Sequence, residues 1–406
     1  MSEMQAITSA PGKIMWIGGY AVLEQPNISY NTGVDKRVFA RAKEAEKISF
    51  NIPQFGINLN AEFNGEKIVF KKELDENEKP MEFVKSVAEN CLIYLKAKGK
   101  QTKAFELTTI TDPAFGLGKT KTGLGSSAAV TAAATAAIMV LHGYDVKKDV
   151  HLIHKLAQYV HSTVQGKVGS GFDIATACFG GHAYSRYSPS LVQDKGVVEA
   201  VDAEWDYSAE HIPVPRGFIT ALADIVGEST STREMVAKYK DYKKAKPEEF
   251  GAFLSELNKA NIRAIEAIKK LNELAEKDSA AYDAALETLE HPAFKEFVKA
   301  FNDARAKTKE LGKRMGANVE SDAATELLDE SNRNGAIVSR LPGAGGGDAV
   351  AAWCNSKENK KKLEKFWKRY EEVKVKPMEL SISSEGVKLE TDTTFEKWLI
   401  KKGVET

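Results

Sequence analysis

A glycine-rich loop followed directly by a run of small apolar residues constrains this chain more than any other feature. The segment is KTKTGLGSSAAVTAAATAAIMVLHG, residues 119–143. Its alanine-rich part predicts a buried helix, because alanine is the strongest helix former. Ser126 can cap the start of that helix, and Gly143 stands where it would end. The loop would then lie at the positive end of the helix dipole, beside free backbone N–H groups, which is where phosphate binds readily.

Known glycine-loop patterns fit this segment only in part. Residues 116–120 resemble the end of a P-loop, but Pro113 occupies the position of its first glycine. No protein-kinase catalytic or metal-binding motif follows the loop. A dinucleotide pattern, G-x-G-x-x-A, begins at Gly123, yet the strand expected before it ends near Ile110, about a dozen residues too early. The alternative to a phosphate site is a glycine-rich helix cap without a ligand.

The composition disfavours several classes of protein. Lys plus Arg and Asp plus Glu both number 57 in 406 residues, so the net charge gives no reason to expect nucleic acid or an anionic membrane as partner. A hydrophobic content of 43% is enough for two domains. Three widely spaced cysteines form neither a zinc motif nor a disulfide framework. With no signal-peptide core and no membrane-length apolar run, the sequence predicts a soluble, cytoplasmic protein.

The order of the expected elements predicts two α+β domains. In the first, strand-like runs are interrupted by turns at Pro11-Gly12 and Gly18-Gly19, and helices follow near residues 83–98 and 149–166. In the second, the strand FITALADIV precedes a largely helical region, residues 233–315, whose apolar residues recur at helical spacing. A strand–glycine loop–strand unit, a helix and a last strand complete the order.

Three further motifs carry candidate functional groups. Lys13 follows Pro-Gly near the first strand, and Asp173 ends the glycine-rich GSGFD. Residues 343–348 read GAGGGD, and so many glycines suggest a backbone that approaches another group closely. The structural alternatives are a solvated turn lysine, a helix-capping aspartate and a flexible turn between strands.

Two other features suggest ligands but have simpler explanations. His151, His154 and His161 lie on one expected helix, and His154 and His161 share a face. They lack the four-residue spacing with an acidic partner that is typical of a metal site. The lysine-rich KENKKKLEKFWKR has apolar residues at helical spacing, which predicts an amphipathic helix rather than a nucleic-acid site.

Four segments taken together resemble the signature segments of the GHMP kinases in order and spacing. They are APGKIMWIGGYAVL, KTGLGSSAAVT, GSGFDIATACFGG and LPGAGGGDAV. Within this superfamily the chain most resembles the phosphomevalonate kinases. Residues 18–20 read Gly-Gly-Tyr where most members have a central glutamate, Lys121-Thr122 precede the glycine loop, and GSGFD is paired with GAGGGD.

The resemblance implies an α+β fold of two domains, with bounds at residues 1–190 and 191–406. The N-terminal domain would contain a left-handed βαβ unit and bind ATP. The C-terminal domain would be ferredoxin-like, and the active site would lie in the cleft between the two.

The resemblance also implies which residues form the site. Lys13 and Asp173 would be the catalytic pair that faces the acceptor, and Ser127 would be the hydroxyl ligand of Mg²⁺. The ATP phosphates would be bound by Lys121, Thr122, Gly123, Leu124, Gly125, Ser126, Ser127 and Ala128. The substrate would be bound by Lys13, Tyr20, Ser170, Gly171, Ser229, Thr230, Ser231, Thr232, Arg340, Gly345 and Gly346.

The implied activity is phosphoryl transfer from ATP to 5-phosphomevalonate, giving 5-diphosphomevalonate in the mevalonate pathway of isoprenoid synthesis. The expected protein is a monomer or homodimer with no nucleic-acid or membrane partner. Alternatives are a kinase for mevalonate, mevalonate 3-phosphate or a sugar, and a diphosphomevalonate decarboxylase. A dehydrogenase using the same loop and a regulator of the same fold without turnover are further alternatives.

Overall fold

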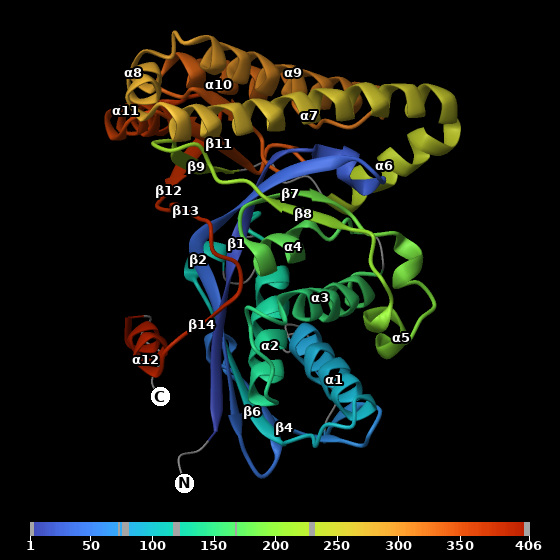
Figure 1. Cartoon of the computed structure of the whole chain (residues 1–406). Coiled ribbons are helices and arrows are strands. Elements are labelled where there is room, and N and C mark those ends of the chain that lie inside the picture. Colours follow the sequence, from blue (N-terminus) through green and yellow to red (C-terminus); the bar gives the residue numbers. More distant parts are fainter. Residues whose placement is uncertain are drawn as a thin grey trace.

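Two β-sheets form the framework of the molecule (Figure 1). The computed structural model describes residues 4–71, 74, 81–116, 122–166, 169–226 and 232–401, without the side chains of 233 and 397–401. Along the large sheet the strands run in the order β14-β1-β2-β6-β3-β4-β5, while β13 and β7 also pair with β2, and β8 pairs with β7. Its strands are β1 (Gln5–Ile17), β2 (Ile28–Glu44), β3 (Ile48–Ile52), β4 (Ile57–Phe63), β5 (Ile68–Phe70), β6 (Phe105–Thr111), β7 (His182–Ser185), β8 (Ser208–His211), β13 (Ile382–Ser383) and β14 (Lys388–Leu389).

Strand β1 is longer than the sequence suggested. It runs through Pro11-Gly12, where the register with β2 shifts between Pro11 and Lys13. The turn predicted there is therefore wrong, because the proline and glycine are accommodated as a bulge inside the strand. The strand ends before Gly18, which has a φ of 117° and starts the short 3₁₀ helix η1 (Gly19–Leu23). Lys13 directly follows the bulge and lies within β1, which ends at Ile17.

Helices cover one face of the large sheet, on the right of it in Figure 1. They are α1 (Met81–Ala97), α2 (Ser126–Leu141), α3 (Val150–Val164), α4 (Phe172–Phe179) and α5 (Val197–Asp202). The connection from β3 to its parallel neighbour β6 contains α1, which makes a βαβ unit. The alanine-rich helix α2 packs directly on β1 and β2.

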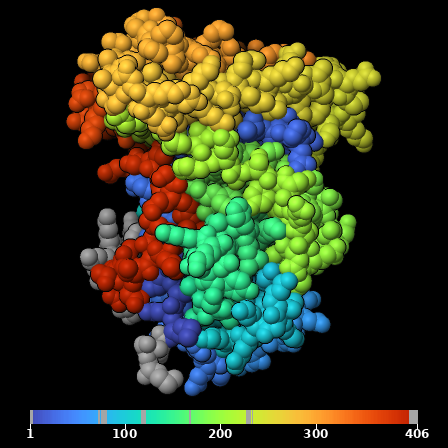
Figure 2. All heavy atoms as spheres, in the orientation of Figure 1, coloured from blue at the N-terminus to red at the C-terminus, as the bar shows by residue number. Residues whose placement is uncertain are grey.

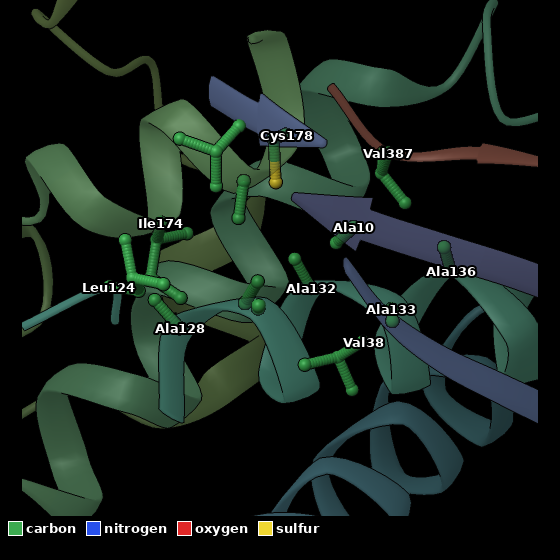
Figure 3. Close-up of a cluster of buried hydrophobic side chains, with 14 of the residues drawn as sticks. Ala10, Val38, Leu124, Ala128, Ala132, Ala133, Ala136, Ile174, Cys178 and Val387 are labelled. Carbon is green, nitrogen blue, oxygen red and sulfur yellow. The ribbon is translucent and has the colours of Figure 1, made fainter. Parts of the chain in front are cut away.

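Small side chains bring α2 close to the sheet (Figure 3). The hydroxyl of Thr8 on β1 donates to the carbonyl of Ala133 at 2.7 Å, which requires the helix backbone to lie near the strand. The buried cluster drawn there includes Ala10, Val38, Leu124, Ala128, Ala132, Ala133, Ala136, Ile174, Cys178 and Val387. The N-cap of α2 is Gly125, so the prediction that Ser126 caps the helix is wrong: Ser126 is its first residue.

The small sheet has the order β10-β11-β9-β12, with every pair antiparallel. Its strands are β9 (Ile219–Val226), β10 (Val338–Arg340), β11 (Ala349–Cys354) and β12 (Lys374–Met378). Helices follow β9, and α11 (Lys357–Arg369) connects β11 to β12, so the chain order is β-α-β-β-α-β. That order with this pairing is the expected ferredoxin-like arrangement.

The helices that lie between β9 and β10 in the chain form a layer over the small sheet, at the top of Figure 1. These helices are α6 (Thr232–Ala245), α7 (Pro247–Lys277), α8 (Ser279–Thr288), α9 (Pro292–Arg314) and α10 (Asp322–Arg333). The long helices α7 and α9 pack against each other. In the part of the chain that the structure describes, none of the helices is both long and apolar enough to span a bilayer.

After β12 the chain returns to the large sheet, and the red segment lies over it in Figure 2. Residues 381–391, called the return segment here, pair through β13 with β2 and through β14 with β1. Helix α12 (Asp392–Lys401) then places Phe395 on Ile7, Phe39 and Ile110. The return segment also contacts the end of α4, because the N–H of Val387 donates to the carbonyl of Cys178 at 3.2 Å.

Candidate active site

The glycine loop and the start of α2 have backbone geometry suited to binding an anion. Gly123 and Gly125 have φ values of 68° and 80°, a conformation that glycine adopts without strain. The first hydrogen bond of the helix runs from the N–H of Ala129 to the carbonyl of Gly125. The N–H groups of the residues between them therefore precede the helical ladder and are available to an anion. Among the predicted ATP ligands, Lys121 lies outside the described residues.

Two hydrogen bonds join this loop to β1 at Lys13. The backbone N–H of Lys13 donates to the carbonyl of Leu124 at 2.9 Å, and its ammonium group donates to the carbonyl of Gly123 at 2.8 Å. A Cβ on Gly125 would lie 3.2 Å from Cγ and Cε of the lysine. Leu124 is buried in the core, and the hydroxyl of Thr122 donates to the carbonyl of Ala114 at 2.8 Å. The loop is thus held on both sides of its glycines.

A second helix start, that of α4, faces the same lysine. Its N-cap is Gly171, with a φ of 78°, and Asp173 stands in its first turn. The Asp173 side chain is partly exposed, and its Oδ1 accepts the N–H of Ile174 at 3.0 Å. The Lys13 ammonium lies 5.2 Å from the centre of the Phe172 ring. Removal from water lowers the pKa of Lys13, and the negative charge of Asp173 opposes that shift.

The backbone around Asp173 is fixed by buried hydrogen bonds. The Gln158 amide donates to the carbonyl of Gly171 at 2.7 Å, and the Tyr184 hydroxyl donates to that of Ser170 at 3.1 Å. A Cβ on Gly171 would come within 2.3 Å of the Gln158 amide oxygen, so only glycine fits. Ser170 and Gly171, two of the predicted substrate residues, thus lie beside Asp173. Their main-chain carbonyls already accept hydrogen bonds within the fold.

His161 is a residue at this site that the sequence did not identify. Its Nε2 lies 3.1 Å from the hydroxyl oxygen of Ser127 and 3.9 Å from Oδ2 of Asp173. The histidine sits on α3 and is almost fully buried. The spacing in the sequence predicts that His161 shares a helix face with His154. That spacing does not predict which loops this face contacts.

The site suits a magnesium ion that arrives with a nucleotide. Among the described residues, no group of three or more His, Cys, Asp or Glu side chains gathers in a way that could hold a metal. Magnesium bound to nucleotides typically keeps water and phosphate oxygens and takes only one or two protein ligands. The Ser127 hydroxyl, in the first turn of α2, fits that role.

A second cluster contains predicted substrate residues from both halves of the chain. The hydroxyl of Tyr20, on η1, donates to the carbonyl of Ala344 at 2.7 Å and lies 3.2 Å from the sulfur of Met235 on α6. A Cβ on Gly345 would come within 2.3 Å of the Val319 carbonyl oxygen, and Gly346 donates its N–H to the same oxygen at 2.9 Å. These glycines therefore let the loop pack closely on Val319.

Arg340 lies in the same region but is only 3% exposed. Its guanidinium donates to the main-chain carbonyls of Trp16 and Leu341, and burial lowers its pKa to about 10, against the opposing charge of Glu320. Arg340 thereby connects β10 to the end of β1, the strand that carries Lys13. Of the remaining predicted substrate residues, Thr232 is exposed at the start of α6, and Ser229, Thr230 and Ser231 lie outside the described residues.

Comparison with known proteins agrees with this architecture. The family described as GHMP kinases N terminal domain matches residues 82–181, and GHMP kinases C terminal matches residues 284–372. A phosphomevalonate kinase of Saccharolobus solfataricus is 30% identical, over 86% of this chain and 90% of that protein. A mevalonate kinase of Thermococcus sibiricus is 26% identical, over 88% and 91%.

A solved structure supports the fold independently. The crystal structure of Streptococcus pneumoniae phosphomevalonate kinase in complex with phosphomevalonate and AMPPNP has a TM-score of 0.70. It is 16% identical, and the match covers 93% of this chain and 99% of that one. Because two family domains match, a relative is 30% identical and the fold is shared, the chain belongs to the GHMP kinase family.

Proposed function

We propose that the protein transfers the γ-phosphoryl group of ATP to 5-phosphomevalonate, giving 5-diphosphomevalonate and ADP. The observation that carries the proposal is the meeting of two helix starts at one lysine. Lys13 donates to the carbonyl of Gly123 in the loop before α2, and it interacts with Asp173 in the first turn of α4. A site that brings two phosphate groups together needs such convergent positive potential. The relatives named phosphomevalonate kinase support the choice of acceptor.

The nucleotide would bind through the start of α2. The N–H groups of Ser126, Ser127 and Ala128 precede the helical ladder, so they can donate to the β- and γ-phosphate oxygens. Bound Mg²⁺ would neutralise phosphate charge, and the Ser127 hydroxyl would be its protein ligand. Lys121 and Thr122 would complete the contacts of the loop.

The transfer itself is a displacement at the γ-phosphorus. An oxygen of the acceptor's 5-phosphate forms the new P–O bond while the bond to the β-phosphate oxygen breaks, and ADP leaves. Lys13 is placed to reduce the repulsion between the two anions as they approach. Two unit charges about 4 Å apart repel by about 4 kcal/mol at an effective dielectric constant near 20.

Asp173 has a different role here from that in an alcohol kinase. An alcohol acceptor must lose a proton, and an aspartate beside it can act as the base. A phosphate monoester has a second pKa of about 6, so it is already mostly dianionic at neutral pH. Asp173 therefore orients Lys13 and the acceptor rather than removing a proton.

The rest of the acceptor would lie among the residues that the resemblance implies. Ser170 and Gly171 adjoin Asp173, whereas Tyr20, Arg340, Gly345 and Gly346 gather at the second cluster. Arg340 would act there through the field of its buried charge and by fixing β1, since its donors face main-chain carbonyls. Ser229, Thr230, Ser231 and Thr232 are further candidates for binding the substrate. The proposal includes a cytoplasmic monomer or homodimer.

An ADP-release assay over a panel of acceptors tests this function. The panel contains mevalonate, its 3- and 5-phosphates, 5-diphosphomevalonate, galactose and homoserine, and the product is identified by mass. We expect 5-phosphomevalonate to have the highest kcat/KM and a product heavier by one phosphoryl group. Higher kcat/KM with mevalonate would support the function named for the Thermococcus sibiricus relative instead. Loss of carbon dioxide from 5-diphosphomevalonate would indicate a decarboxylase.

A further inference from the structure

His161 connects the nucleotide side of the site to the acceptor side. One atom, its Nε2, lies 3.1 Å from the hydroxyl of Ser127, 3.1 Å from the amide nitrogen of Gln165 and 3.9 Å from Oδ2 of Asp173. Its side chain is 6% exposed, and the Phe83 ring lies 5.6 Å from the imidazole, centre to centre. A histidine in this position is held in one orientation.

The hydrogen-bond partners define which way the protons point. An amide nitrogen donates, so the contact between the Gln165 amide nitrogen and Nε2 of His161 favours a ring whose Nε2 carries a lone pair. The imidazole proton of that ring stands on Nδ1, and the single lone pair of Nε2 is shared between the Gln165 amide and the Ser127 hydroxyl, both at 3.1 Å.

This arrangement leaves the lone pairs of the Ser127 oxygen pointing away from the histidine. A hydroxyl that binds a cation does so through a lone pair, and its proton needs another acceptor. His161 supplies that acceptor on the buried side, behind the first turn of α2. Without it, the Ser127 proton would turn toward another acceptor, and the Asp173 carboxylate is near, 3.9 Å from the same Nε2 atom.

We propose that His161 is a positioning residue, which accepts the Ser127 hydroxyl proton, aims the serine oxygen at the metal–nucleotide complex and keeps it apart from Asp173. The inference rests on the proposed function, since it takes Ser127 as the metal ligand. It predicts that loss of the His161 side chain weakens binding of the metal-bound nucleotide more than binding of the nucleotide alone.

Two substitutions separate this role from simple packing. His161→Leu removes the acceptor but keeps an apolar side chain of similar size, whereas His161→Gln keeps an acceptor oxygen at nearly the distance of Nε2. A matched control is His142→Gln, at the far end of the same helix as Ser127. His142 is also hydrogen-bonded there, to the N–H of Lys103 at 3.0 Å, and lies away from the loop.

The experiment measures the affinity of a non-hydrolysable ATP analogue by calorimetry, with Mg²⁺ and with a chelator, in the absence of acceptor. For His161→Leu we expect the affinity with Mg²⁺ to fall about 10–100-fold, the range for partners of metal ligands, while the affinity without metal stays within about twofold. We also expect kcat with 5-phosphomevalonate to fall by a similar factor with little change in its KM. His161→Gln should recover most of both losses, and His142→Gln should match the wild type.

Three results would overturn the inference. They are wild-type affinity and kcat in a folded His161→Leu protein, an equal loss with and without Mg²⁺, and a His161→Gln protein as impaired as His161→Leu. Thermal unfolding of each variant shows whether the fold is intact. Because nucleotide binding is measured without acceptor, these results hold whichever acceptor the enzyme uses. Turnover of 5-phosphomevalonate by the wild type tests the proposed function separately.

Discussion

The ammonium group of Lys13 and the carbonyl oxygen of Gly123 are 2.8 Å apart, which joins the first strand to the loop that starts α2. The same lysine interacts with Asp173 across the site. A single cation is therefore positioned by the loop expected to bind the donor and by the helix expected to face the acceptor. Changes on either side of this lysine should affect the transfer in different ways.

Replacing Ser127 with alanine should remove the proposed protein ligand of Mg²⁺ and leave the fold intact, because the side chain is only partly buried at the first turn of α2. We expect kcat to fall by about 10²-fold or more, and the activity to need higher Mg²⁺. The measurement is kcat across a magnesium titration. Near-normal turnover at every magnesium concentration would contradict the assigned role.

Replacing Gly125 with valine should abolish ATP binding. The residue has a φ of 80°, and its Cβ would lie 3.2 Å from two carbons of Lys13, so the substitution strains the loop and displaces the lysine. Gly143→Val is the matched control, because its φ of 88° carries the same strain at the other end of α2 with nothing within 4 Å. Calorimetry should show lost affinity only in the first variant. Equal affinities in the two would count against the phosphate loop.

The pH dependence of an Asp173→Asn variant should distinguish a phosphate acceptor from an alcohol. If the acceptor's own dianion attacks, the acid limb of kcat/KM follows substrate ionisation near about pH 6. The variant should then be slower but keep that limb, whereas loss of a general base would flatten it. The measurement is the pH–rate profile of both proteins with 5-phosphomevalonate. A limb that disappears in the variant would restore Asp173 as a base.

Lys13→Met should lower kcat more than Asp173→Asn does. It removes the cation between two approaching phosphates, and a repulsion of about 4 kcal/mol corresponds to at most about a thousandfold in kcat. Asp173→Asn keeps Lys13 and only disturbs its orientation. Steady-state rates at saturating ATP compare the two. A milder effect of Lys13→Met would show that charge screening is not what limits the transfer.

The three cysteines should be dispensable for catalysis. All three are free and buried, and burial raises the pKa of Cys91 and of Cys354 to about 12, so no reactive thiolate forms at neutral pH. Replacing Cys91, Cys178 and Cys354 together with alanine should lower stability and keep most of kcat. Circular dichroism controls for folding. A large loss of kcat in the folded triple variant would reveal a chemical role.

Acid should destabilise the fold through buried histidines. Burial, with a smaller contribution from His211, lowers the pKa of His182 to about 4, against about 6.5 in the unfolded chain. Between these values the unfolded state binds the proton and the folded state does not, so stability falls as the pH drops below 6.5. One such histidine contributes about 1.4 kcal/mol per pH unit, or about 2 kcal/mol between pH 6.5 and 5.

Urea unfolding at pH 7 and pH 5 measures this loss, with His182→Gln as the comparison. The variant should be less stable at pH 7 and should lose less stability on acidification. An unchanged loss in the variant would assign the acid sensitivity to other groups.

Local patterns predicted much of this fold. Helix α2 was expected from its alanines and lies within a residue of its predicted start, and α1 and α3 lie where apolar spacing placed them. The wrong turn at Pro11-Gly12 has a physical reason. Proline and glycine are turn residues by local preference, but a bulge between paired strands accommodates them equally well.

The contacts that make the site could not be predicted in the same way. Lys13 meets Gly123, and Ser127 meets His161, only because β1, α2 and α3 pack together, and no local preference encodes that packing. The family resemblance supplied Lys13, Ser127 and Asp173 as members of one site. It supplied nothing about His161, whose side chain contacts two of the signature segments from a helix outside them.

The return segment has a consequence for how the protein folds. Strand β14 pairs with β1 and β13 pairs with β2, and a Cβ on Gly386 would come within 2.0 Å of the Cys178 carbonyl oxygen at the end of α4. Strands β1 and β2 thus take neighbours from residues that follow the whole small sheet in the chain. Such contacts close a very long loop, so we expect the end of the helix that carries Asp173 to be covered late in folding.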